Sequence, residues 1–483
     1  MDHATAPPEG LRAGAVTLPG AIMQSITTMS PAVSVIFSVP FLAVTSGYLS
    51  PLAVFLAAVV SYLLGYSLAQ LTRHLRSAGS YGSFTRQLIG PRSAFMVSWV
   101  YLLFYPVATA MLTTLLGSTM HQILLANYGI DIPWWLPMVV LIAVVALLAI
   151  RGVEMAVGVV VVLGLAEILI MLTLCVWCLF VPGDGGTSIS WIWGDNSPGM
   201  GAFFLGFIFS IYNLTGWDNA ATLGEETSNP LKNVPRAVLG SIVIMGIFVV
   251  ITTWGEITGW GTNQLSTMAD SDIPPIFVLA ERHWGAAWIL APIAMITAII
   301  GACLACMNAS IRIFYEMGRT GTLPATLGRL NRNRTPGNAV VLQTVLNVVV
   351  GFLLVGTVGL SEVFPFTGLM FVFALNFVYV LANFAVWRLY RTRALSEFNI
   401  VKHGAIPIIG SVALVAVSYM SLNPIPAAPL NWALPVVIAW FILGIAILVI
   451  RSLRGDTEWL TRSEEFEKVQ TSESAAPPAM EPS

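Results

Sequence analysis

Polar residues interrupt an apolar segment of membrane character at residues 200–223. The interruption places an acid and two amides near the middle of the segment, and it reads Asn213, Leu214, Thr215, Gly216, Trp217, Asp218 and Asn219. A carboxylate at the centre of a bilayer costs about 2.5–3.5 kcal/mol on insertion scales, so these groups are expected to face protein or a water-filled cavity. Gly216 lowers the cost of leaving helical geometry. The pattern indicates either a helix whose polar face packs on its neighbours or a discontinuous helix that binds a solute with unwound backbone, and we favour the second.

The first apolar segment, residues 18–46, is interrupted in a similar way. Pro31 lacks an N–H group and its ring clashes with the carbonyl of Thr27, so we expect that carbonyl to be free for another partner. Interruptions at corresponding positions of two halves are typical of inverted-repeat transporters, which bind their substrate between the repeats near the membrane midplane. We therefore expect the two interruptions to bind a substrate together, through Thr27, Thr28, Met29, Ser30, Asn213, Leu214, Thr215, Gly216 and Trp217.

Glu167 lies deep within another apolar segment, residues 154–181. Its distance from the cytoplasmic end of that segment is about 14 residues, or roughly 21 Å at 1.5 Å per residue, which is well inside the hydrocarbon region. Burial disfavours an isolated charge. Glu167 is therefore either a hydrogen-bonded structural residue or a carrier of a proton or cation, and we favour the carrier.

The composition excludes an ordinary soluble domain, because 57% of the residues are hydrophobic and only 10% are charged. The apolar segments predict an all-α membrane protein with about 12 transmembrane helices. We expect a cytoplasmic segment at 1–17, a ten-helix core at 18–403, two additional helices at 404–451 and a disordered cytoplasmic tail at 452–483. The predicted spans are 18–46, 50–71, 94–125, 134–150, 154–181, 200–223, 235–256, 286–317, 338–356, 362–387, 405–422 and 431–450.

The basic residues predict the orientation of the chain. If both termini are cytoplasmic, every Lys and Arg except Arg282 falls in a cytoplasmic segment, as the positive-inside rule requires. Residues 1–17 lack the pattern of a cleavable signal peptide, so the first helix is expected to be retained. These features indicate a multi-pass protein of the cell membrane, in contact with membrane lipid.

Other kinds of site find little support in the sequence. Two Cys-x-x-Cys pairs, Cys175 with Cys178 and Cys303 with Cys306, are expected near opposite faces of the membrane, too far apart for a shared tetrahedral metal site. We expect no metal and no cofactor. The sequence also lacks a nucleophile–base pair, a phosphate-binding Gly-Lys-Ser/Thr loop, and basic residues interleaved with aromatic ones. These absences argue against an enzyme, an ATP-driven pump and a nucleic-acid-binding protein.

Residues 216–238, GWDNAATLGEETSNPLKNVPRAV, carry a resemblance to a known family. They resemble the signature that follows the sixth transmembrane helix in permeases of the amino acid–polyamine–organocation superfamily. By the pattern of spans, the similarity extends over about residues 15–390. The resemblance implies a LeuT-like fold with a five-plus-five inverted repeat and broken helices 1 and 6. The family usually has Gly-Ser/Thr-Gly at the break of the first helix, where this chain has Ser30-Pro31-Ala32.

The resemblance also implies roles for residues outside the two interruptions. An aromatic residue of the third helix covers the substrate in this family, which implies such a role for Tyr101 or Tyr105, although aromatic stripes often serve packing alone. Glu167 falls where some members carry a lysine. In related folds, hydroxyl groups of the eighth helix coordinate sodium, so Asn308 and Ser310 are candidates for ion coupling together with Glu167.

The implied function is secondary active transport of an amino acid or related amine by alternating access. Coupling to H⁺ as symport, or exchange, is expected, and Na⁺ is the alternative coupling ion. A polyamine or organocation permease is a second possibility. A membrane sensor that binds the solute without transport is a third, although the segment after Arg451 is short for a signalling domain.

Overall fold

The computed structural model describes residues 16–75, 80–151, 154–192, 199–224, 227–331 and 335–455. Within these ranges the chain is almost entirely helical and contains no β-strand. Most of the expected N-terminal segment 1–17, most of the expected tail 452–483 and the Glu225-Glu226 step of the signature lie outside the described residues.

The twelve predicted spans all correspond to helices. Nine helices of the described chain are long and apolar enough to cross a membrane, and three shorter apolar helices fall at Trp135–Ile150, Gly164–Phe180 and Met200–Asn213. The spans after the first are formed by α4 (Ser50–Thr72), α6 (Pro91–Tyr128), α7 (Trp135–Arg151), α8 (Glu154–Phe180), α9 (Met200–Asn213), α11 (Pro230–Trp260), α13 (Leu290–Arg319), α14 (Gly337–Val358), α15 (Val363–Thr392), α16 (Ile406–Met420) and α17 (Ala433–Leu453). Two short helices, α5 (Ser80–Leu88) and α12 (Pro275–Trp284), lie outside the predicted spans.

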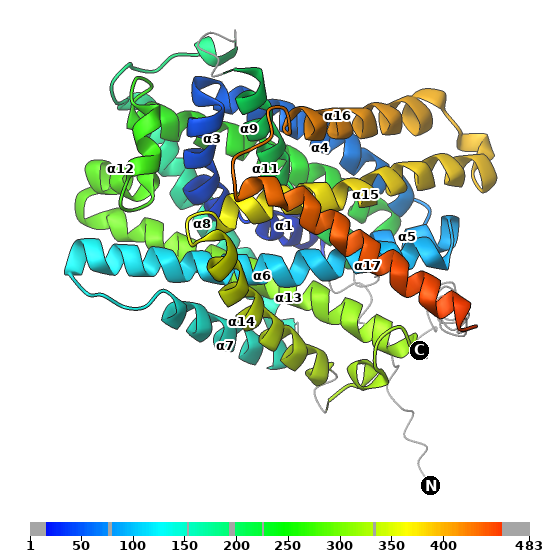
Figure 1. The fold of residues 1–483 in the computed structure, drawn as a ribbon. Coiled ribbons are helices and arrows are strands. Elements are labelled where there is room, and N and C mark those ends of the chain that lie inside the picture. Colours follow the sequence, from blue (N-terminus) through cyan, green and yellow to red (C-terminus); the bar gives the residue numbers. More distant parts are fainter. Residues whose placement is uncertain are drawn as a thin grey trace, which may run out of the picture.

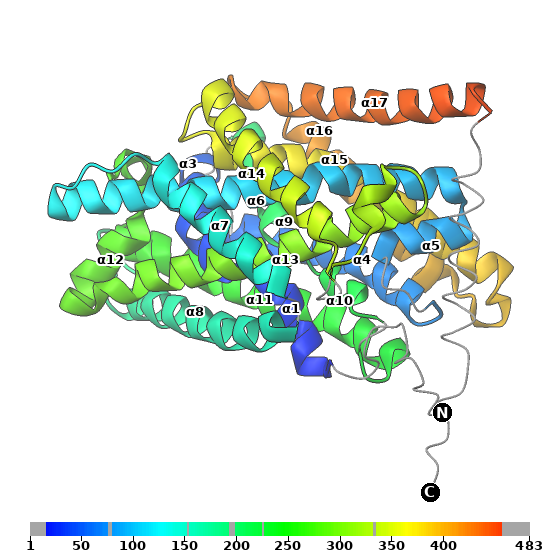
Figure 2. The same cartoon turned by 90° about the horizontal axis from the view of Figure 1, so that it is seen from below.

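The helices differ in how far they are enclosed by the rest of the bundle. In the most hydropathic window of each span, 83% of α6 and 78% of the first span are buried, compared with 17% of α17. Figure 1 places α1 (Leu18–Met29) in the middle of the bundle, and α17 runs along one edge in Figure 2. Apolar side chains of α17 therefore face outward, as expected for contact with lipid, whereas the first span and α6 form the interior.

The first span is broken at Ser30. α1 ends at Met29, and Ser30 takes a left-handed conformation with φ 51° and ψ 77°. Non-glycine residues adopt this conformation at a cost of about 1–2 kcal/mol. The chain then continues through α2 (Pro31–Val33), a π-helical segment η1 (Ser34–Ser38) and α3 (Val39–Thr45). Ser30 thus adopts a backbone conformation that a glycine would adopt without strain.

The Thr27 carbonyl, predicted to be released by Pro31 for another partner, finds that partner in the adjacent backbone. That carbonyl accepts a 3.1 Å hydrogen bond from the backbone N–H of Ser30, which also lies 3.1 Å from the carbonyl of Ile26. The left-handed turn brings this N–H back over the end of α1, so the carbonyl released by Pro31 is paired within the same turn.

The sixth span is broken over five residues. α9 ends at Asn213, residues 214–218 form turns, and α10 (Asn219–Thr222) resumes the helix. Gly216 has φ 130°, a conformation that side chains rarely allow. A Cβ atom added to Gly216 would lie 3.2 Å from the backbone nitrogen of Met29. The backbone at Gly216 is therefore packed against the end of α1, so the two breaks lie next to each other. The sequence predicted this arrangement from the interruptions in the first helix of each half.

Candidate functional site

Ser25 of α1 joins the two broken helices. Its hydroxyl donates a 3.0 Å hydrogen bond to the carbonyl of Trp217 and accepts one, also 3.0 Å, from the backbone N–H of Ala220. Both backbone groups lie at the break between α9 and α10, where helical hydrogen bonding is interrupted. A buried backbone group without a partner costs about 1–3 kcal/mol, so Ser25 stabilises the unwound conformation.

Two more pairs of side chains connect the broken helices. Asn219 Nδ2 donates to Thr28 Oγ1 at 2.5 Å, and the Thr28 hydroxyl donates to the carbonyl of Gln24 at 2.9 Å. On the other side of the breaks, the Ser38 hydroxyl donates to the amide oxygen of Asn213. Side-chain hydrogen bonds therefore connect the first and sixth spans on both sides of the two breaks.

Several buried polar atoms at the breaks have no partner in the described part of the chain. These atoms are Oγ1 of Thr27, Oγ of Ser30 and Nδ2 of Asn213, and each residue is no more than 4% exposed. The backbone N–H groups of Gly216 and Trp217 also take part in none of the described hydrogen bonds. Buried polar atoms are nearly always paired in folded proteins. The hydroxyl oxygens can accept and the nitrogens can donate, so the set suits a ligand that carries both an ammonium and a carboxylate.

Aromatic side chains close the α10 side of the break. Trp217 is fully buried, and its ring stacks on Tyr379 of α15 with centroids 5.2 Å apart. The hydroxyl of Tyr101 on α6 donates a 2.7 Å hydrogen bond to Asp218. The Tyr101 ring stacks on Tyr105, also at 5.2 Å. The predicted aromatic pair of α6 therefore reaches the break, where Tyr101 engages the acid.

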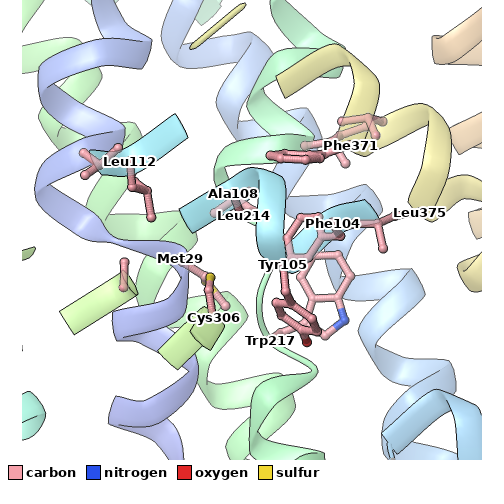
Figure 3. Close-up of a cluster of buried hydrophobic side chains, with 14 of the residues drawn as sticks. Met29, Phe104, Tyr105, Ala108, Leu112, Leu214, Trp217, Cys306, Phe371 and Leu375 are labelled. Atoms are coloured by element: carbon pink, nitrogen blue, oxygen red, sulfur yellow. The ribbon is translucent and has the colours of Figure 1, made fainter. Parts of the chain in front are cut away.

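Apolar side chains surround the α9 side of the break, as Figure 3 shows. Aromatic contacts connect this region across three helices, because the Phe371 ring of α15 lies 4.8 Å from that of Phe104 on α6 and 5.7 Å from that of Tyr212 on α9. We call the following buried residues the apolar wall: Met29, Phe104, Ala108, Leu112, Leu214, Cys306, Phe371 and Leu375. None of them is charged, so a charged ligand group placed against this wall would lose its hydration without gaining a partner.

Glu167 of α8 lies beside the break of the first helix. The residue is 1% exposed and its Oε2 has no partner among the described residues. The carboxylate interacts with the backbone N–H of Ala32, the second residue of α2. A Cβ atom added to Gly164 would lie 3.0 Å from Thr27 Oγ1 and 3.8 Å from Glu167 Oε1, so Thr27 and Glu167 flank the same point. The structure thus brings this carboxylate to the break, as the coupling hypothesis requires.

The candidate residues of α13 are placed differently. Ser310 is fully buried and donates a 2.6 Å hydrogen bond to Gln343 of α14, and Asn308 is half-buried. α13 approaches the first helix at Gly301, where an added Cβ atom would lie 3.0 Å from Thr27 Cγ2. The described hydrogen bond of Ser310 therefore joins α13 to α14 and does not connect Ser310 with Glu167.

The site predicted from the sequence omits five residues that the structure makes important: Ser25, Ser38, Asn219, Tyr379 and Glu256. Ser25 and Asn219 are both part of the two interruptions, and only their polarity could have identified them as site residues from the sequence. Glu256 is fully buried, although the sequence placed it at the last residue of a predicted span. α11 continues to Trp260, so this end of the span is enclosed by protein.

The model of the family described as amino acid permease matches residues 20–458. Among relatives, the branched-chain amino acid permease BcaP of Bacillus subtilis is 25% identical over 434 residues, covering 85% of this chain and 87% of that protein. BcaP of Lactococcus lactis is 25% identical over 328 residues, and the low-affinity putrescine importer PlaP of Escherichia coli K12 is 26% identical over 305 residues. These two matches cover 61% and 62% of this chain and 66% of each relative, just under two thirds of their length.

A solved structure supports the fold. It is described as the substrate-bound outward-open state of a Na⁺-coupled sialic acid symporter, and it is 17% identical with a TM-score of 0.51. The match covers 85% of this chain and 91% of that one. Together with the two broken helices, it confirms the predicted all-α transporter fold with a five-plus-five repeat.

Proposed function

The chain belongs to the amino acid permease family of the amino acid–polyamine–organocation superfamily, and we propose that it transports an amino acid with an apolar side chain by alternating access. The observation that carries this proposal is the set of unpaired polar atoms at the two breaks. The apolar wall includes Met29 and Leu214, which are the chain neighbours of Ser30 and Asn213. A multi-pass position in the cell membrane, with both termini cytoplasmic, belongs to the same proposal.

The two charged ends of an amino acid would be bound by different groups. The N–H groups of Gly216 and Trp217 and the amide nitrogen of Asn213 would donate to the carboxylate, as unwound segments do in this fold class. The ammonium would donate to the hydroxyl oxygens of Thr27 and Ser30. In this arrangement, main-chain groups supply part of the recognition and the side chain of the substrate remains free to contact the apolar wall.

The apolar wall favours a neutral side chain over a polyamine. A second ammonium would need a buried acceptor, and Asp218 already accepts a hydrogen bond from Tyr101. Leaving a cation unpaired against apolar side chains would cost several kcal/mol. Among the relatives, the branched-chain amino acid permeases are therefore a better guide to the substrate class of this chain than the putrescine importer is.

We propose that Glu167 couples transport to a proton. Its unpaired oxygen and its position beside Thr27 place a titratable group at the break that must rearrange during transport. A sodium ion would need several oxygen ligands, and Ser310, one of those expected, is bonded to Gln343. Proton symport is therefore better supported than sodium coupling.

Uptake by purified protein in liposomes tests this proposal. With an inward proton gradient, radiolabelled leucine, valine or methionine is expected to accumulate, whereas putrescine, arginine and glutamate are not. Binding of leucine without uptake, under any gradient, would support the sensor instead. Uptake of putrescine alone would refute the apolar substrate while leaving transport intact.

A further inference from the structure

A second buried carboxylate, Glu256, lies near the end of α11. The residue is fully buried, and neither carboxylate oxygen has a hydrogen-bond partner in the described part of the chain. Thr253, one turn earlier on α11, also has an unpaired and buried hydroxyl. An ionised carboxylate in this setting would be uncompensated, which is costly, so the protonated form fits the site. Packing alone gives no reason for such a residue, because a leucine or glutamine would fill the same volume.

The groups that face Glu256 hold no cation against it. α8 presents the buried thiols of Cys175 and Cys178, which are the acid's electrostatic neighbours. On α12, Arg282 donates to the carbonyl of Gly259 at 3.3 Å and lies near Cys178. α12 also carries Glu281, which is exposed, and His283, and the segment after α8 brings the exposed Asp184 beside Gly261. Tyr48 belongs to the same apolar cluster as Ile257, and Asp270 of η4 (Leu265–Asp270) is exposed, whereas η1 and α3 contain no titratable residue.

The chemistry of these neighbours favours a proton over a metal cation as the species that Glu256 binds. Alkali and alkaline-earth cations prefer oxygen ligands, and neutral thiols are poor ligands for them. Within the described chain, no group of three or more His, Cys, Asp and Glu residues is arranged to hold a metal ion. A proton needs no such set, because a single carboxylate binds it by a covalent O–H bond.

Glu167 is a residue of α8, and Glu256 of α11 faces the same helix farther along, at Cys175 and Cys178. Cys175 and Cys178, which face Glu256, follow Glu167 by 8 and 11 residues, so the two carboxylates are separated by about 12–17 Å along the helix axis at 1.5 Å per residue. Between them, Met171 and Leu174 are completely buried. These apolar residues lie on α8 between the two acids, so a proton can pass only after water enters between α8 and α11.

We propose that Glu256 is the outer proton carrier of this transporter, which delivers the coupling proton to Glu167; this inference rests on the proposed function. A hydronium ion from the outer solution protonates the Glu256 carboxylate and leaves water. In the outward-open state, the Glu256 O–H bond breaks and its proton passes through water to the Glu167 carboxylate, leaving Glu256 ionised until the next proton arrives. Two sites in series explain why each acid is buried with at least one carboxylate oxygen that has no partner among the described residues.

Two measurements test the role of Glu256. The first is uptake of leucine into liposomes as a function of outer pH, for the parent, Glu256→Gln and the control Glu281→Gln, an exposed acid of neighbouring α12. Glu256→Gln is expected to slow proton-driven uptake about tenfold or more and to flatten its dependence on outer pH. Exchange of leucine at equal pH on both sides is expected to stay within about twofold, because no net proton transfer is needed, and the Glu281→Gln control is expected to match the parent.

The second measurement uses the parent protein and does not depend on the folding of a variant. Dicyclohexylcarbodiimide reacts with protonated carboxyl groups in apolar surroundings, and mass spectrometry identifies the labelled residue. Labelling of Glu256 that decreases as outer pH rises supports the proposal. A Glu256→Gln variant with unchanged pH dependence, or a Glu256 that is unlabelled at every pH, overturns it. If the parent accumulates leucine with a sodium gradient but not with a proton gradient, the proposed role of Glu256 is wrong, while the proposed transport function is retained. If the parent moves no solute, the proposed function itself is wrong.

Discussion

The hydroxyl of Ser25 lies 3.0 Å from the carbonyl oxygen of Trp217, although 192 residues separate them in the sequence. The same hydroxyl accepts from Ala220, so one side chain of the first helix satisfies backbone groups on both sides of the turn at Asp218. The conformation of the sixth helix therefore depends on a residue of the first.

Ser25→Ala should weaken substrate binding. The substitution leaves the Trp217 carbonyl and the Ala220 N–H buried without partners, at a cost of about 2–3 kcal/mol to the unwound conformation. We expect affinity for leucine to fall roughly tenfold or more, measured by scintillation proximity binding. Ser61→Ala is the matched control, because Ser61 is also fully buried and its hydroxyl has no partner among the described residues. Equal losses in both variants would contradict a specific role for Ser25.

Gly216→Leu should abolish binding while leaving the protein in the membrane. The residue has φ 130°, and an added Cβ atom would lie 3.0 Å from Thr28 Cγ2 and 3.2 Å from the backbone nitrogen of Met29. A leucine would enter the space between the breaks and strain the backbone. Equilibrium binding and size-exclusion chromatography check the two parts. Gly356→Leu on α14, where an added Cβ atom meets nothing within 4 Å, should bind normally.

Tyr101→Phe should open the α10 side of the site. Loss of the Tyr101 hydroxyl leaves Asp218 buried without the 2.7 Å hydrogen bond that this hydroxyl donates, at a cost of about 1–3 kcal/mol. Cys306 is buried and lies electrostatically close to Asp218, so its labelling by a membrane-permeant maleimide reports this opening. In a chain whose only cysteine is Cys306, we expect labelling to become several-fold faster, as the destabilisation predicts. Tyr128→Phe, at an exposed tyrosine, should label at the parental rate.

Glu167→Gln should separate exchange from accumulation. Glutamine keeps the shape and can still accept from the Ala32 N–H, but it does not titrate. Exchange of labelled for unlabelled leucine should therefore persist, while accumulation driven by a proton gradient is lost. Liposomes with an imposed gradient test both reactions in one preparation. If the Gln variant accumulates leucine to the same level as the parent does, Glu167 serves packing alone.

The fold could be predicted from the sequence because each relevant signal is local. Apolar length identifies the spans, Pro31 and Gly216 mark the breaks, and the signature after the sixth helix identifies the family. The left-handed conformation of Ser30 could not be predicted, since residues other than glycine rarely adopt it. The partner of the Thr27 carbonyl could not be identified either, because the Ser30 N–H reaches this carbonyl only once Ser30 has adopted that conformation.

The candidate site was harder to predict because its contacts are not local. Ser25 finds its partners in the sixth helix, and Tyr379 reaches Trp217 from α15. From the sequence, Glu256 was expected at the end of a transmembrane helix. Nothing in the sequence shows that α12 and η4 enclose that end of α11. The roles assigned to Thr27, Gly216 and Glu167 remain predictions, for which the experiments above are the tests.

The links between the broken helices have a mechanical consequence. Ser25 with Trp217 and Ala220, Thr28 with Asn219, and the backbone of Val16 with that of Ser228 at 2.9 Å all join the half of the first helix before Ser30 to the half of the sixth after Gly216. We therefore expect these two segments to move together, with Ser30 and Gly216 as the positions where the backbone bends. A substrate bound between the breaks would then lose its contacts with both helices at the same time.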